Sequence, residues 1–120
     1  MNENKIKEIL LKGECVTMEC KRAKSEVPKS IWETYSAFAN TIGGVIMLGI
    51  EENRKETDIT KRFQIIGVDD AQKIVNDFWN TINSDKVNEN ILGSSDVDTV
   101  EINGMQIVYI HVPQAAWRIK

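Results

Sequence analysis

The sequence predicts an α/β (α+β) domain, in which helices pack on a mixed β-sheet. Residues 16–22 alternate between apolar and polar side chains, which is typical of a strand with one polar face. A helical apolar pattern over residues 30–42 runs through Gly43 and Gly44 into the uniformly apolar stretch VIMLGI. Near the end, the dipeptide Asn-Gly at 103–104 separates two strand patterns, which indicates a β-hairpin. Helices and strands in this order favour a sheet with helices packed on it.

The first elements are a helix and a strand. Apolar residues at helical spacing predict a short helix over residues 3–12, closed by Gly13. In the strand over residues 16–22, Glu19 and Lys21 project from the same face because the side-chain period of a strand is two.

The next segment predicts a helix that leads into a buried strand. Ser30 and Glu33 have the spacing of a capping box. The apolar stripe of this helix is Ile31, Tyr35, Phe38, Ala39 and Ile42. Gly43 and Gly44 stop the helix and permit a tight turn. Because residues 45–50 are uniformly apolar, we expect a central strand covered on both faces.

The second half predicts one more helix and three strands. Asp69 or Asp70 can cap a helix over residues 70–84. Its apolar face consists of Ile74, Phe78 and Ile82. The other segments are a polar loop over 51–62, a strand over 63–68, a polar connection over 84–96, and the hairpin with a type I′ turn at Asn103–Gly104.

Length and composition indicate one globular domain over residues 1–120. The apolar fraction is 42% and the charged fraction 28%, and no apolar run approaches the roughly 20 residues of a membrane helix. The N-terminus lacks the pattern of a secretory signal, so the cytoplasm is the expected compartment. The last residues, QAAWRIK, follow a strand without a closing element, and we interpret the chain as the N-terminal fragment of a longer protein.

The charge balance restricts any nucleic-acid role to a local patch. The net charge is -3, whereas a strongly basic binding protein has a high isoelectric point. The segment KRAKSEVPK supplies four candidate contacts to phosphate groups: Lys21, Arg22, Lys24 and Lys29. A solvated loop that keeps the protein soluble is the alternative. Trp32 could stack on a base, although half-buried packing is the favoured interpretation.

Other candidates have a structural alternative of their own. Asn40, Gly43 and Gly44 form a candidate nucleotide-binding site, because glycines let backbone amides approach a phosphate. The alternative is a tight turn, and the P-loop pattern is missing. Cys15 and Cys20 are interpreted as packing residues, since an extended strand holds them too far apart to bridge.

Four segments resemble the Schlafen-type AlbA domain: GECVTMECK, AFANTIGG, LGIEE and IIGVDD. The resemblance covers residues 5–113, and this family has also been described as a divergent AAA-type ATP-binding family. It implies a DNA- or RNA-binding domain of a bacterial transcriptional regulator. Because Alba-like proteins dimerise, it also allows a homodimer.

Some Schlafen proteins are metal-dependent ribonucleases, and their acidic triad corresponds here to Glu14, Glu19 and Glu51, with Glu52 as an alternative for the third. The resemblance therefore implies Mg²⁺ or Mn²⁺ on these carboxylates and Lys21 beside the reacting phosphate. The chain departs from the family pattern in two places, with Cys20 for an aromatic residue and glutamates for aspartates after the central strand. Surface ion pairs with neighbouring Lys and Arg residues are the alternative role of these glutamates.

Overall fold

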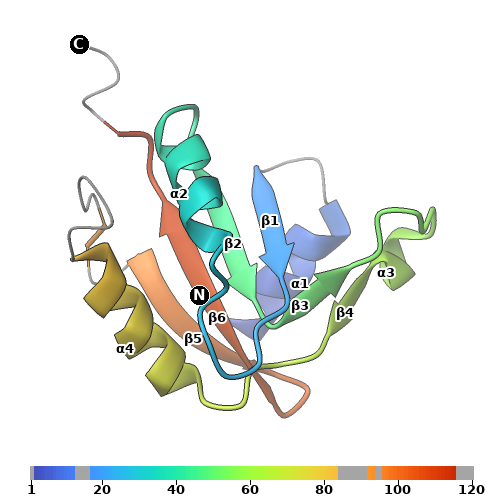
Figure 1. Ribbon diagram of the computed structural model, residues 1–120. Helices are drawn as coiled ribbons and strands as arrows, with labels where there is room; N and C mark the ends of the chain where they lie inside the picture. The colour runs from blue at the N-terminus through green and yellow to red at the C-terminus, as the bar shows by residue number, and fades with distance from the viewer. Residues whose placement is uncertain (1, 13–16, 84–91, 94–95, 116–120) are drawn as a thin grey trace.

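The computed structural model describes residues 2–12, 17–83, 92–93 and 96–115. Its main sheet has four strands in the order β1-β2-β6-β5 (Figure 1). Their bounds are Met18–Lys21 for β1, Gly44–Leu48 for β2, Met105–Val112 for β6 and Val97–Ile102 for β5. The pair β1–β2 is parallel and the other two pairs are antiparallel, so the sheet is mixed. The predicted fold class is confirmed.

Two layers cover the sheet. In Figure 1, α2 (Ile31–Ala39) and α4 (Ala71–Ile82) lie in front of it, and α1 (Glu3–Lys12) lies behind it. A two-stranded sheet of β3 (Ile50–Glu52) and β4 (Phe63–Ile65) extends to one side, together with α3 (Ile59–Arg62). Because helices or strands cover both faces, β2 is almost entirely buried, and Ile107, Val108 and Ile110 of β6 are buried beside it.

The alternation of side chains assigns each strand residue to one of two cores. On β2, Ile46 and Leu48 join the cluster under α2 and α4, whereas Val45 and Met47 join the cluster with α1. On β1, Met18 and Cys20 pack against the α1 cluster. Glu19 and Lys21 therefore point to the α2 side, as the period of two predicts.

The central strand is shorter than predicted. Gly49 has a φ of +100°, and a Cβ atom there would lie 3.0 Å from the Ile107 side chain. Gly49 ends β2, and the chain turns into β3, which pairs with β4 instead of β6. Burial was predicted correctly, because Ile46, Met47 and Leu48 are fully buried.

Residues 66–69 continue beside the main sheet rather than extending β4, so the predicted strand 63–68 ends at Ile65. Ile66 and Gly67 donate to the Gly49 carbonyl at 2.9 and 2.8 Å, and Val68 donates to the Gln106 carbonyl at 2.9 Å. Val68 and Gln106 form an isolated bridge. The predicted polar loop over residues 51–62 likewise contains the end of β3 and all of α3.

The predicted caps and turns have different outcomes. Asp70 caps α4 by accepting from the Lys73 amide at 3.1 Å, as predicted. The capping box at Ser30 is wrong, because Ser30 has a helical backbone conformation and its side chain makes no capping hydrogen bond. Asn103 and Gly104 have φ of 53° and 78°, which confirms the type I′ turn.

The stripe of α2 also ends earlier than predicted. Ile42 is 77% exposed, because the helix ends at Ala39 and the following turn carries Ile42 away from the core. The expectations for Gly13, Glu14 and Cys15, for residues 84–91, and for the QAAWRIK end from Ala116 onward lie outside the described residues. Within the part of the chain that the structure describes, no helix is long and apolar enough to span a membrane.

Candidate nucleic-acid interface

A charged rim lies where β1 and β2 end. We define the charged rim as Glu19, Lys21, Arg22, Glu51, Glu52 and Arg54. β1 and β2 run parallel, with Lys21 opposite Leu48, and the turn at Gly49 then carries β3 past β1. The rim therefore occupies the carboxyl ends of parallel strands, where open α/β sheets commonly bind ligands.

Two arginines connect the carboxylates of the rim. Arg54 Nη2 lies 3.2 Å from Glu19 Oε2, and Arg54 Nε lies 3.7 Å from Glu52 Oε1. Arg22 Nη1 lies 3.8 Å from Glu51 Oε1. The arginine side chains are 70% exposed for Arg22 and 71% for Arg54. Exposed pairs of this kind contribute about 0–1 kcal/mol, so a competing anion can replace the carboxylates at little cost.

We call residues 21–30 the basic segment, and the Lys21 side chain joins its two ends. Its Nζ donates to Ser30 Oγ at 3.1 Å and lies 4.0 Å from Glu19 Oε1, and its side chain is only 13% exposed. The two ends of the segment from 21 to 30 therefore meet at this hydrogen bond. Arg22 and Lys29, one residue inside each end, flank the same point, and both are exposed.

The basic segment is anchored to the rest of the fold. Ala23 is buried in the core under α2 and α4. The Lys24 carbonyl accepts from the Asp69 amide at 2.7 Å, and the Ser25 carbonyl accepts from Lys73 Nζ at 3.0 Å. The Lys24 side chain stays exposed. The cations of the basic segment are therefore presented on an anchored backbone.

The predicted metal ligands are only partly brought together. Glu19 and Glu51 belong to the same rim, whereas Glu14 lies outside the described residues. Among the residues that are described, no three His, Cys, Asp or Glu side chains are grouped so that they could hold a metal ion. The Glu19 and Glu52 carboxylates share Arg54 instead. The described donors thus do not form a complete site for Mg²⁺ or Mn²⁺, and the glutamate triad stays a prediction.

The geometry of Asn40, Gly43 and Gly44 favours a turn. The amides of Thr41 and Gly43 both donate to the Phe38 carbonyl, at 3.2 and 2.8 Å. This is the carboxyl end of α2, where the helix dipole is negative and repels phosphate. A Cβ atom at Gly44 would lie 2.7 Å from the Phe38 ring. The glycines therefore make room for close packing, and we propose no nucleotide site here.

The inner side of β1 is apolar. Burial, together with the nearby carboxylates of Glu52 and Glu19, raises the pKa of the Cys20 thiol to about 12. The thiol is therefore neutral at physiological pH, and it packs with Met18 as the sequence suggested. Trp32 likewise packs in the core, with its ring stacked on Phe78 at a centroid distance of 5.3 Å.

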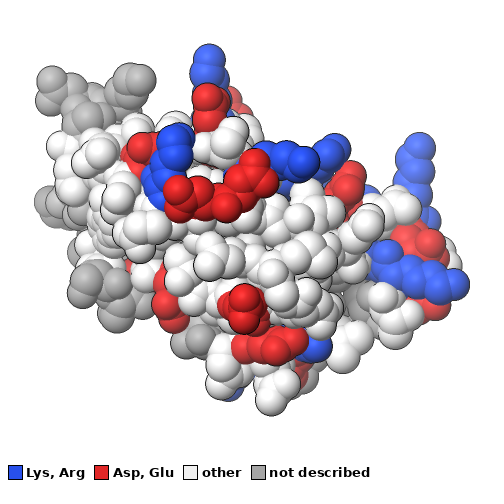
Figure 2. Space-filling view, turned by 90° about the horizontal axis from the view of Figure 1, so that it is seen from below, with Lys and Arg blue, Asp and Glu red and all other residues white. Residues whose placement is uncertain are grey.

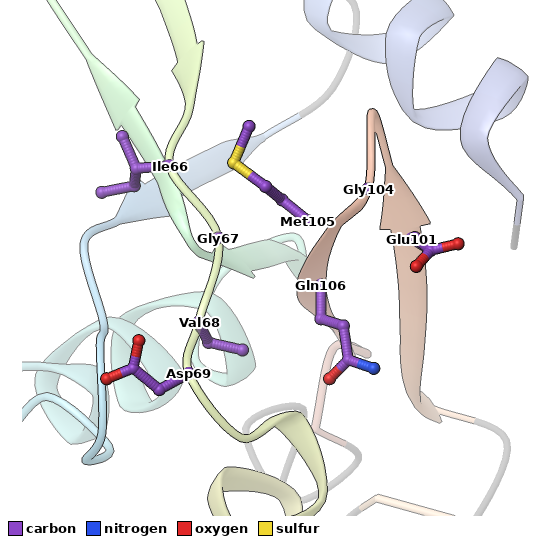
Figure 3. Close-up of a pocket in the computed structure, with 8 residues that line it drawn as sticks. All are labelled: Ile66, Gly67, Val68, Asp69, Glu101, Gly104, Met105 and Gln106. Atoms are coloured by element: carbon purple, nitrogen blue, oxygen red, sulfur yellow. The ribbon is translucent and has the colours of Figure 1, made fainter.

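Charges of both signs are mixed on the surface. Figure 2 shows Lys and Arg side chains beside Asp and Glu on the face seen from below, around a broad uncharged area. A groove of about 500 Å³ between residues 66–69 and the β5–β6 hairpin is lined by Asp69 and Glu101 but by no Lys or Arg among the described residues. Figure 3 shows that Glu101 points away from residues 66–69 and that Met105 extends toward them. The groove is unsuited to phosphate.

Sequence reasoning missed two arginines, one in the rim and one beside it. Arg54 links Glu19 and Glu52, and Arg62 lines a hollow beside Glu51 and Glu52. Both lie in the stretch over residues 51–62 that we expected to be a polar loop. A signal existed in the acidic pair Glu51–Glu52, which is followed at once by Asn53 and Arg54.

The fold and the rim define an α+β domain whose exposed arginines are paired with carboxylates at the end of a parallel strand pair. The model of the family described as Schlafen, AlbA_2 matches residues 14–118. The chain therefore belongs to the Schlafen AlbA_2 family, which confirms the resemblance seen in the sequence. No curated protein matches the chain.

The chain is also similar to a solved structure. This is the solution NMR structure of the N-terminal domain of a protein from Nitrosomonas europaea, described as related to the ATP-dependent DNA helicase RecG. The TM-score is 0.70 and the sequence identity 25%, over 98% of this chain and 76% of the other. The similarity extends over nearly the whole described fold.

Proposed function

We propose that this chain is a nucleic-acid-binding domain of a bacterial transcriptional regulator. Arg22, Lys24, Lys29 and Arg54 contact the phosphate backbone, and Lys21 holds the segment that carries the first three. The observation that carries the proposal is the pair of arginines, 70% and 71% exposed, on one rim. Membership of the Schlafen AlbA_2 family and the likeness to a RecG-related domain support a role on nucleic acid.

The electrostatics favour weak contacts that depend on salt. A phosphate that approaches the rim replaces a carboxylate as the partner of each arginine, so the net gain per contact is small. The net charge of -3 opposes association at long range. Binding then comes from release of counterions by a few local contacts, and its affinity falls as salt rises.

Binding is favoured over cleavage because of Arg54. Its guanidinium group pairs with both Glu19 and Glu52, so a divalent cation would compete with a covalently attached positive charge for the same oxygens. Cleavage of structured RNA in the presence of Mn²⁺ that is lost in a Glu19→Gln variant would overturn this assignment and favour the ribonuclease alternative.

Fluorescence anisotropy with labelled oligonucleotides at low salt tests the proposal. We expect the double variant Arg22→Ala/Arg54→Ala to bind more weakly and to reduce the slope of log K against log salt by about 1.4 to 1.8, as expected for two lost phosphate contacts. The matched control is Lys5→Ala/Lys7→Ala, which removes two exposed charges from α1 on the other face of the sheet. Equal slopes in both variants, or no binding at about 100 μM protein, would contradict the proposal.

A further inference from the structure

A small polar pocket lies next to the charged rim, between the β3–β4 pair and α3. Its volume is about 320 Å³. It is lined by Glu51, Glu52, Asn53, Lys61, Arg62 and Gln64. Pairing of β3 with β4 places Glu51 opposite Gln64, and the Asn53 amide donates to the Arg62 carbonyl at 2.8 Å. Backbone hydrogen bonds therefore fix the walls of the pocket.

One residue of the lining, Arg62, has a buried donor that lacks a partner. The Nε atom of Arg62 is buried and has no hydrogen-bond partner among the described residues. A buried donor left unsatisfied lowers stability by about 1–3 kcal/mol, and such groups are rare in native proteins. A small rotation of the Arg62 side chain toward the pocket would bring Nε to an acceptor on a ligand.

The lining indicates the chemistry of that ligand. The two glutamates balance Lys61 and Arg62, so the pocket has no net charge and a phosphate inside it would face two carboxylates. Amide groups of Asn53 and Gln64 supply both donors and acceptors. The volume is at the lower end of the range of about 300–1,000 Å³ for ligand pockets. A small, uncharged, polar ring that carries both acceptors and amine donors matches this lining.

Guanine has this combination. Its O6 and N7 atoms accept hydrogen bonds from arginine, and its exocyclic N2 amine donates to acceptors such as carboxylates. The pocket touches the phosphate-binding rim directly, because Glu51 pairs with Arg22 and Glu52 pairs with Arg54. A nucleotide whose phosphates lie on these arginines therefore has its base near the pocket.

We propose that the pocket of β3, β4 and α3 binds an unpaired guanine base of a single-stranded nucleic acid. The proposal rests on the proposed function, since the rim holds the phosphates of the same strand. An unpaired base can turn out of the base stack and enter a pocket, whereas a base in a duplex must first break its base pair. The domain should therefore prefer single strands that contain guanine to duplexes and to oligothymidine.

An Arg62→Met variant tests the pocket. Methionine has a similar length but no donor, so the melting temperature should stay equal or rise while affinity for guanine-containing single strands falls on the order of 10-fold. Affinity for duplex should change much less. The control Lys55→Ala removes an exposed cation from the same hairpin but outside the pocket lining. A similar loss in both variants, or no loss in Arg62→Met, would overturn the pocket and leave the proposed function intact.

A titration with guanosine separates the two proposals, because a nucleoside has no phosphate. With ¹⁵N-labelled protein, millimolar guanosine should shift the side-chain amide signals of Asn53 and Gln64, and thymidine should not. These shifts in a protein that fails to bind oligonucleotides would support the pocket and refute the phosphate contacts. Unmoved amide signals with guanosine would overturn the pocket, whatever the oligonucleotides do.

Discussion

The Gly43–Gly44 turn and the charged rim lie at opposite ends of β2, and they differ in what holds them together. At the turn, the Gly43 amide already donates to the Phe38 carbonyl, and the Phe38 ring fills the space where a Cβ at Gly44 would lie. Neither group is left for a ligand. At the rim, exposed ion pairs hold side chains that other anions can reach. We therefore expect binding to use the exchangeable contacts of the rim, although the glycines are the more conspicuous motif.

The largest expected effect breaks the turn. Gly43 has a φ of +81°, and a Cβ there would lie 2.8 Å from the Val112 carbonyl oxygen. We expect Gly43→Ala to lower the free energy of unfolding by about 3 kcal/mol, from overpacking and from the unfavourable backbone conformation together. Urea denaturation followed by circular dichroism measures this change.

Gly104→Ala is the matched control, because Gly104 has a φ of +78° with nothing within 4 Å of the added Cβ. We expect a loss of about 1–2 kcal/mol there, from backbone conformation alone. Equal losses in the two variants would mean that close packing is not what the Gly43 turn requires.

Elements with a strong periodic signal were predictable from the sequence. The apolar face of α4, its cap at Asp70 and the turn at Asn103–Gly104 all depend on local chemistry, and all are confirmed. Gly49 was missed because the apolar run VIMLGI has no polar residue to mark a break. Besides its positive φ, Gly49 has Gly67 and Ile107 packed where a Cβ would lie, and these contacts are distant in sequence.

The candidate site was predictable in part for a similar reason. Alternation along β1 is local, so the shared face of Glu19 and Lys21 followed from the sequence. The guanidinium that pairs with Glu19 belongs to Arg54, 35 residues away, and it reaches β1 only because the chain turns at Gly49. Ser30 likewise has the sequence of a cap but accepts a hydrogen bond from Lys21, because the basic segment folds back on itself.

The next expected effect is on the pH dependence of stability at Cys20, which lies between the rim and the core. Its pKa is raised from 9.0 to about 12 in the folded protein, so the folded state holds the thiol proton more tightly than the unfolded state. The stability from this group is present below the unfolded pKa and is lost as pH rises above it. We expect the wild type to lose about 1 kcal/mol more than Cys20→Ala between about pH 9 and pH 10, as measured by urea denaturation in reductant. Parallel pH profiles would show that the thiol is open to solvent.

The smallest expected effects concern the residues before two helices. Ser30 precedes α2 and contacts Lys21 of the rim, and Asp70 precedes α4. Asp70 accepts a hydrogen bond from the Lys73 amide, so Asp70→Ala should lower the free energy of unfolding by about 1 kcal/mol. Ser30 caps no amide, and water can replace its hydroxyl as a partner of Lys21. Ser30→Ala should therefore lower stability by less than about 0.5 kcal/mol while it releases the closed end of the basic segment.

When stability and binding are measured together, Asp70→Ala should lose stability but not affinity, and Ser30→Ala should lose affinity but little stability. Asp70→Ala leaves the rim intact, so its oligonucleotide affinity should match the wild type under conditions where both are folded. In Ser30→Ala, Lys21 loses one of the contacts that position Arg22 and Lys29, and affinity should fall although stability hardly changes. A Ser30→Thr variant keeps the hydroxyl and should restore binding. If Ser30→Ala instead lost stability as Asp70→Ala does, with unchanged affinity, Ser30 would be an ordinary cap and Lys21 would not organise the rim.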